Sequence, residues 1–416
     1  MSASEEVKFS LKVVINKEQN KVLFAEADSN FADVLISFMT LPLGTIVRLL
    51  VNHFGDEAPT IGSLNTLYQG LSNLESSHFW TDTGKQILLN ARNSLAFLCQ
   101  KLKLNLDDNM SPAPALLPLE LEEEPQQTKQ ADFLLTDDLQ VVPNSAVVCI
   151  QILNNLGIKD TNELEERTVT VGFKEIMELL KASLFSRTPL TDVIFHKSQM
   201  VSTNIVISQL PQITEDSTTK KMILKAIIRK STNKVLLAQA DEDFIDFLFS
   251  LLSIPLGRVV CLLGSNTCLG GVDNLYRSIK NLDTGKYLKT EDLKSSLLKP
   301  KLPPEYLSKN MIFSHTEVMT RPFSNVHFVD LNGKSGYVKG PALFMVTDDL
   351  VVTPSSAISG ISLIKNLKIP FSDVEERQFE IGMEEALNIL KASLMSTSAL
   401  TDGLKPISKR QVKQEK

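Results

Sequence analysis

The sequence predicts an α+β protein built as a tandem duplication of one domain. The clearest observation is that residues 11–50 align without a gap on residues 224–263, with 21 of 40 positions identical. Two further blocks align in the same way: 134–156 on 345–367, and 165–192 on 375–402. Among these three blocks the offset between the copies changes only from 213 to 210. Both copies should therefore share one topology.

The length of 416 residues accommodates two such units, each large enough for its own core. We predict a first α+β repeat at 8–196, a linker at 197–221 and a second α+β repeat at 222–404. The linker is rich in Ser, Thr and Gln and lacks periodicity, which is typical of flexible connections. Residues 405–416 form a basic, polar tail, which we expect to be disordered.

Each repeat should begin with a β-hairpin followed by a capped helix. Apolar and polar residues alternate over 11–15 and again over 21–25, with polar residues between the two runs. Asp28 and its counterpart Asp241 then precede apolar helical patterns. A carboxylate at this position can accept a backbone N–H and complements the positive end of the helix. Both residues are therefore predicted helix N-caps.

A Pro-Gly corner should divide the first helix of each repeat from the second. Pro42 and Gly44 form this corner in the first repeat, and Pro255 and Gly257 form it in the second. Neither residue type is favoured inside a helix, so the chain should turn and start a new helix there. A third, short helix is expected near 67–74 in the first repeat and near 275–282 in the second.

The two repeats diverge most in their middle segments, 75–131 and 283–340, which we predict to be loops. Each repeat then continues with a strand pair, a helix that opens after a Pro and a Ser, a strand and a closing amphipathic helix. The apolar stripe of the closing helix is expected at Phe173, Ile176, Met177, Leu180 and Leu184, and at Met383, Ala386, Leu387, Leu390 and Leu394.

Composition excludes several classes of protein. The net charge of −6 and the pI near 5.6 argue against nucleic acid as a partner, because such binding needs clustered Lys and Arg. Four cysteines without a C-x-x-C pair indicate a reducing compartment, so we expect a cytoplasmic protein, with the nucleus as the alternative. The N-terminus lacks the basic and apolar regions of a secretory signal.

No membrane span is expected either. The most apolar long stretch, 31–51, is broken by Pro42 and Gly44 and carries Asp33 and Arg48 at its flanks. Its counterpart in the second repeat contains Arg258, which would lie at the depth where a membrane hairpin should be most apolar. Buried helices of a globular core explain both stretches better.

The segment 340–354 (GPALFMVTDDLVVTP), the two Pro-Leu-Gly corners and the paired Lys-Ala-Ser-Leu helices resemble a plant-specific family of uncharacterised proteins with a duplicated domain of unknown function. The resemblance covers nearly the whole chain. It implies the duplicated fold but no activity, cofactor or catalytic residue. Family members often carry cysteine pairs in the divergent middle segment, which would imply zinc. This chain has only Cys99 there, so we predict no metal site of that kind.

The strongest candidate for ligand binding is a duplicated pair of aspartates, Asp137–Asp138 and Asp348–Asp349. Two carboxylates can hold Mg²⁺ or Ca²⁺ through their oxygens. Adjacent side chains of a strand point to opposite faces, so one ion meets both only where the backbone turns. Aspartate is itself a preferred turn residue, and we favour a turn over a cation site at both pairs.

Other apparent motifs are weaker. Asn332–Gly336 contains Gly-Lys-Ser, but Phe328 occupies the place of the first glycine of a phosphate loop, and Asn-Gly predicts a hairpin turn instead. Ser296 and Lys299 have the spacing of a Ser-x-x-Lys nucleophile. Pro300 follows directly and ends any helix, and a four-residue pattern with two free positions recurs by chance. The five histidines form no pair at metal-ligand spacing.

We therefore predict a non-catalytic interaction or regulatory protein, in which two pseudo-symmetric repeats present a groove to a protein or peptide partner. The alternative is an enzyme, or a binder of a small molecule or metal, that uses the duplicated aspartate pairs. An enzyme would bring these carboxylates together with another titratable group in a pocket. An interaction protein would instead expose an apolar patch. No catalytic residue, cofactor or oligomeric state is predicted.

Overall fold

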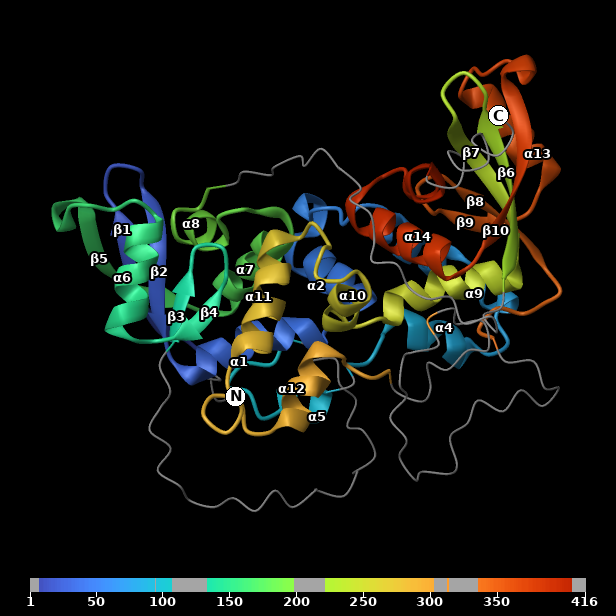
Figure 1. The fold of residues 1–416 in the computed structure, drawn as a ribbon. Helices are drawn as coiled ribbons and strands as arrows, with labels where there is room; N and C mark the ends of the chain where they lie inside the picture. Colours follow the sequence, from blue (N-terminus) through green and yellow to red (C-terminus); the bar gives the residue numbers. More distant parts are fainter. Residues whose placement is uncertain are drawn as a thin grey trace.

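The structure, a computed structural model, describes residues 7–93, 95–106, 133–197, 221–302, 313 and 336–405. The predicted linker, the Gly-Lys-Ser segment and the basic tail lie almost wholly outside these residues. Each repeat contains a five-stranded antiparallel sheet surrounded by helices, so the α+β prediction is confirmed. The two sheets lie at opposite ends of the molecule, with helices of both repeats between them (Figure 1).

The first repeat follows the predicted order of elements. Its strands are β1 (Phe9–Asn16), β2 (Lys21–Ala27), β3 (Phe133–Thr136), β4 (Val141–Pro143) and β5 (Leu164–Val171). Its helices are α1 (Ser29–Ser37), α2 (Leu43–Phe54), α3 (Leu64–Asn73), α4 (Asp82–Leu89), α5 (Ala96–Cys99), α6 (Ala146–Asn155), α7 (Phe173–Phe185) and α8 (Pro189–Ile194).

The second repeat has the same topology. Its strands are β6 (Met222–Arg229), β7 (Lys234–Asp241), β8 (Leu343–Thr347), β9 (Val352–Pro354) and β10 (Val374–Ile381). Its helices are α9 (Glu242–Ser250), α10 (Leu256–Leu262), α11 (Gly270–Asn281), α12 (Glu291–Leu298), α13 (Ala357–Asn366) and α14 (Met383–Met395). The strand orders, β4-β3-β2-β1-β5 and β9-β8-β7-β6-β10, correspond strand by strand.

Local signals in the sequence explain where the first helix of each repeat begins and ends. The Asp28 carboxylate accepts a hydrogen bond from the Phe31 amide at 2.8 Å, and Asp241 does the same for Phe244 at 3.1 Å. Both predicted N-caps are confirmed. Each helix stops before the Pro-Gly corner, as expected for residues that disfavour a helix interior.

The loop prediction for the divergent middle segments was wrong in part, because α4, α5 and α12 lie within them. Two of these helices carry a side-chain N-cap. The Thr81 hydroxyl accepts from the Gly84 amide at 3.0 Å, and the Thr290 hydroxyl accepts from the Leu293 amide at 3.1 Å. Low similarity between the repeats does not imply absence of structure, and the capping threonines are a helix signal that the sequence itself carries.

The two Pro-Gly corners bond directly to each other. The Leu43 amide donates to the Ile254 carbonyl at 3.0 Å, and the Leu256 amide donates to the Leu41 carbonyl at 2.9 Å. Gly44 allows this approach, since a Cβ there would lie 3.1 Å from the Leu252 carbonyl oxygen. The corners therefore join the two repeats at the centre of the molecule through a reciprocal pair of backbone hydrogen bonds.

The third helix of each repeat packs on the other repeat, and we call this arrangement the helix exchange. In α3, the residue before the helix, Ser63, donates from its amide to the Ser393 carbonyl at 2.9 Å and from its hydroxyl to the Ser396 carbonyl at 2.6 Å. In α11, the Ser278 hydroxyl accepts from the Val141 amide of β4 at 2.9 Å. The apolar core is consequently continuous across both repeats.

A second, smaller cluster lies on the opposite face of the first sheet. Leu23, Phe24 and Leu134 are buried there beneath partly buried residues of α6, including Val148 and Ile152. Helix α6 therefore covers the outer face of its sheet with one side only. Its other side, and that of α13 in the second repeat, faces away from the protein (Figure 1).

Candidate functional site

The predicted aspartate pairs lie in tight turns between two strands of each sheet. In the first repeat, Asp137 and Asp138 join β3 to β4, and Leu139 follows with a positive φ of 66°. The Thr136 hydroxyl donates to an Asp138 carboxylate oxygen at 2.5 Å and accepts from the Gln140 amide at 2.9 Å. Leu350 has the same φ of 66° after the second pair. The predicted turns are thus confirmed.

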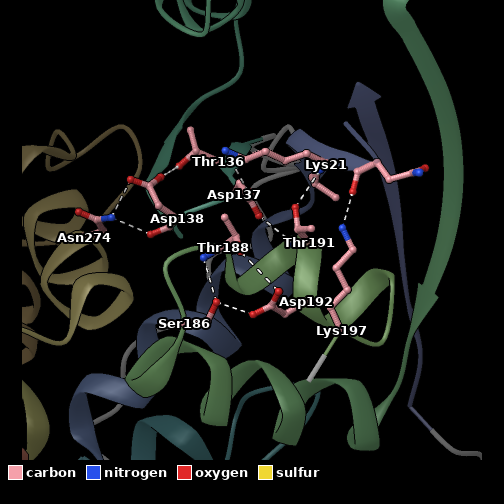
Figure 2. Close-up of polar contacts among 12 residues, drawn as sticks. Lys21, Thr136, Asp137, Asp138, Ser186, Thr188, Thr191, Asp192, Lys197 and Asn274 are labelled. Atoms are coloured by element: carbon pink, nitrogen blue, oxygen red, sulfur yellow. Dashed lines mark hydrogen bonds and ion pairs between the residues drawn. The ribbon is translucent and has the colours of Figure 1, made fainter. Parts of the chain in front are cut away.

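Asp137 points into its own repeat, where it fixes helix α8. Its side chain is buried, and Oδ1 accepts from the Thr191 amide at 2.8 Å (Figure 2). The backbone carbonyl of Asp137 also accepts from the Leu190 amide, at 3.3 Å. Thr191 in turn accepts from the Val22 amide through its hydroxyl, at 2.9 Å. Turn, strand β2 and helix α8 are therefore held together by one aspartate and one threonine.

The second repeat reproduces this arrangement. Asp348 Oδ1 accepts from the Thr401 amide at 2.7 Å, and the Asp348 carbonyl accepts from the Leu400 amide at 3.2 Å. The Thr401 hydroxyl accepts from the Val235 amide at 2.9 Å. Sequence reasoning did not include the two threonines, although Leu-Thr-Asp stands at 190–192 and again at 400–402. The repeated tripeptide was the signal that could have identified them.

Burial perturbs the acidity of these two carboxyls. It raises the pKa of Asp137 to about 6, against the opposing effects of the Thr191 amide and hydroxyl and of Lys21. Lys21 Nζ lies 3.9 Å from Asp137 Oδ2, which has no hydrogen-bond donor in good geometry among the described residues. Burial likewise raises the pKa of Asp348, whose Oδ2 lies 3.6 Å from Lys234 Nζ. Each lysine therefore compensates only partly for desolvation.

The second aspartate of each pair faces the exchanged helix of the other repeat. Asn274 on α11 donates from its side-chain amide to the Asp138 carbonyl at 2.7 Å and to its Oδ2 at 2.8 Å. On the other side, the Thr66 hydroxyl of α3 donates to the Asp349 carbonyl. Sequence reasoning missed both partners, because their role exists only once the helix exchange has brought them to these turns.

The two carboxylates of a pair do not converge. Figure 2 shows Asp137 directed toward Thr191 and Asp138 directed toward Asn274. Within the described ranges, no group of three or more His, Cys, Asp and Glu side chains is placed to hold a metal ion. Ligand binding by Asp137, Asp138, Asp348 and Asp349 remains the alternative to the turn, and their observed bonds serve to hold the turns.

The pKa of Asp137 predicts how stability depends on pH. The folded-state pKa of about 6 lies above the unfolded value of about 3.9, so the native state binds the proton more tightly. The stabilising contribution is complete below about pH 4 and is lost as pH rises through about 6. The loss should be roughly 3 kcal/mol. We expect Asp137→Asn to remove this dependence, so that the variant gains stability relative to wild type between pH 4.5 and 8 in urea melts.

The same melts with Mg²⁺ test the alternative, in which the aspartate pairs bind a cation. A bound cation would favour the ionised carboxylates and would raise the stability of wild type but not of Asp138→Asn, which loses the charge and keeps the turn-forming side chain.

The pH prediction for Asp137 has its own contradicting outcome. If Asp137→Asn followed the wild-type pH profile, the assignment of the raised pKa to this buried carboxyl would be wrong.

Fold and site together define a duplicated α+β protein whose repeated polar residues hold turns and helices in place. The family model described as "Protein of unknown function (DUF674)" matches residues 5–112 and 127–384. The chain therefore belongs to this family. No curated protein and no solved structure matches it. Among the described residues, no helix is long and apolar enough to cross a membrane.

Proposed function

We propose that this protein is a non-catalytic interaction protein that uses one exposed helix of each repeat, α6 and α13, to bind other proteins. The observation that carries the proposal is the repeated exposure of large aliphatic side chains on these helices. Val147 and Ile150 of α6 are 65% and 58% exposed, and Ile358 and Ile361 of α13 are 79% and 55% exposed. Single exposed apolar residues are ordinary, but a cluster at the same place in both repeats marks a contact surface.

The position of the two helices supports binding at two separate places. Helix α6 lies on the sheet at one end of the molecule and α13 on the sheet at the other end (Figure 1). Each helix packs its inner side on the sheet, through partly buried residues in α6 and through buried Ile364 in α13, and leaves the outer side open. The protein would thus bind two partners, or two parts of one partner, at a separation fixed by the shared core.

The observed aspartate bonds support a structural role over catalysis. The polar groups of each turn satisfy backbone amides and hold neighbouring elements, as in Asp137 with Thr191. The alternative function, an enzyme or metal binder at the aspartate pairs, would gain support from the Mg²⁺ response described above.

The cysteines support a proposal on location. None of the four forms a disulfide, which fits a reducing compartment. We therefore also propose a cytoplasmic or nuclear location, in a plant protein.

Selection of peptides from a random phage-displayed library tests the interaction function. We expect enriched peptides to bind the full chain and to lose binding when Ile150→Glu and Ile361→Glu place charges on the two helix faces. Val51→Glu is the matched control, because Val51 is an exposed aliphatic residue on α2, outside both faces. If no peptide were enriched over bare support, or if binding survived both helix substitutions, the proposed function would be refuted.

A further inference from the structure

A hollow of about 400 Å³ opens where helix α13 ends and the chain turns toward β10. Its wall is largely apolar, and the side chain of Phe371 at its rim is 67% exposed. The residues that line it are Ile361, Lys365, Lys368, Ile369, Pro370 and Phe371. The hollow is therefore continuous with the exposed face of α13, since Ile361 belongs to both.

The charged side chains that line this apolar hollow are both lysines. Lys365 and Lys368 are exposed on its wall, and Lys230 lies close by, donating from Nζ to the Ser372 carbonyl at 2.9 Å. The neighbouring carboxylate, Asp373, is already bonded to Arg229 at 2.8 Å. The C-terminal end of α13 contributes only about half a negative charge, which the lysines exceed. A basic rim on a chain of net charge −6 is complementary to an acidic partner.

Lys368 occupies a backbone position that favours glycine. Its φ is 53°, and the end of α13 is closed by the bonds from the Lys368 amide to the Lys365 carbonyl and from the Ile369 amide to the Ile364 carbonyl. The first repeat has Gly157 at this position, with φ 76° and the same pair of closing bonds. A lysine here costs backbone strain that glycine avoids, and this cost points to a use for its side chain.

We propose that this hollow binds a segment of another protein in which a bulky apolar side chain is flanked by carboxylates. The apolar side chain would contact Ile361, Ile369 and Phe371, and the carboxylates would pair with Lys365 and Lys368. The proposal rests on the interaction function proposed above and names the partner chemistry at α13. Binding should be moderate and salt-dependent, because exposed ion pairs are weak and screened.

The first repeat offers a matched control within the same molecule. Its helix α6 ends with Asn154 and Gly157 where α13 has the two lysines, and Thr161 stands in the place of Phe371. Helix α6 therefore lacks the two wall lysines, although Lys17 donates to the Asn162 carbonyl as Lys230 does to that of Ser372, and Lys159 is exposed nearby. Acidic character in the partner should matter more at α13 than at α6.

The test measures fluorescence polarisation of a labelled peptide, two leucines flanked by glutamates on each side, with the full-length chain. The double substitution Lys365→Asn/Lys368→Gly installs the residues of the first repeat, and we expect it to weaken binding about tenfold. Lys368→Gly alone should at the same time raise the melting temperature by about 2 °C, because it relieves the backbone strain. If Lys368→Gly made the protein more stable while the loss of the lysines weakened binding, the Lys368 side chain would serve recognition at the expense of stability.

Three results would overturn this proposal. One is failure of the probe to bind the wild-type chain at any soluble concentration, and another is equal binding of a probe with lysine in place of glutamate. The third is concentration-dependent self-association that Phe371→Ser abolishes, since the occupant would then be a second copy of the chain. If the phage selection yielded peptides for α13 without acidic residues, the interaction function would stand and only the acidic partner would be wrong.

Discussion

Replacing Gly62 with alanine is expected to lower the free energy of unfolding by about 4 kcal/mol, because three costs add at this residue. Gly62 has a positive φ of 47°, which disfavours a side chain. A Cβ would also lie 2.4 Å from the Ser393 carbonyl oxygen and 2.7 Å from the Leu394 carbonyl carbon. The contacting atoms are backbone of α14, which cannot move away without breaking the bonds that Ser63 makes to that helix.

Gly157→Ala is the matched control for this prediction. Gly157 also has a positive φ, 76°, but a Cβ there would meet nothing within 4 Å. It should cost only the backbone strain, about 1 kcal/mol. Unfolding in urea can be followed by the fluorescence of Trp80, the single tryptophan, whose amide donates to the Tyr337 carbonyl of the second repeat at 3.1 Å. Equal losses for the two variants would contradict the close packing of Gly62 on α14.

Separating the two repeats should have a still larger effect. We expect a first fragment and a second fragment, cut between 198 and 220, to be unfolded or aggregated when each is expressed alone. Each fragment would lose the helix of the other repeat that completes its core. For the second repeat this helix is α3 of the first repeat, whose Leu64, Leu67 and Leu71 are fully buried. Exposing such a buried leucine costs roughly 2 kcal/mol, so exposing all three costs about 6 kcal/mol, which is comparable with the whole stability of a typical domain.

Co-expression should restore the fold, because nothing in the helix exchange requires a covalent connection. Size-exclusion chromatography with light scattering should then show a one-to-one complex with the circular dichroism of the intact chain. A stable, folded monomer from either fragment alone would show that a repeat can complete its own core, and the helix exchange would not be needed for folding.

The sequence alone predicted the elements whose signals are local. Asp28 and Asp241 as caps, the corners at Pro42 and Pro255, and the turns at both aspartate pairs depend on neighbouring residues only. The alternation in β1 likewise predicted a strand with one buried face, and Phe9, Leu11, Val13 and Ile15 are buried. These features need no knowledge of the tertiary structure.

The helix exchange could not be predicted, because the two repeats are so similar that α3 and α11 carry nearly the same apolar pattern. Either helix would satisfy the periodicity required by either core. Which repeat each helix packs on depends on contacts between segments remote in sequence, such as that between Ser63 and Ser393. The burial of Asp137 was hidden for the same reason, since its pKa depends on Thr191 of α8, which lies 54 residues further along the chain. Local sequence carries no information about such contacts.

The contacts that α3 and α11 make with the opposite repeats differ at several matched positions, and the pair Gly70 and Ser278 shows how such a difference makes the repeats complementary to each other. Gly70 of α3 leaves room for the Val352 backbone, since a Cβ there would lie 3.1 Å from the Val352 nitrogen. The corresponding Ser278 of α11 instead fills the matching space and binds the Val141 amide.

Two copies of the first repeat would therefore place Gly70 against Val141 and leave a buried amide without its acceptor, at a cost of about 1–3 kcal/mol. Two copies of the second repeat would press Ser278 onto Val352. A homodimer of either repeat would carry the same residue at both positions. The glycine on one side and the serine on the other are therefore expected to favour pairing of a first repeat with a second over self-assembly of either half.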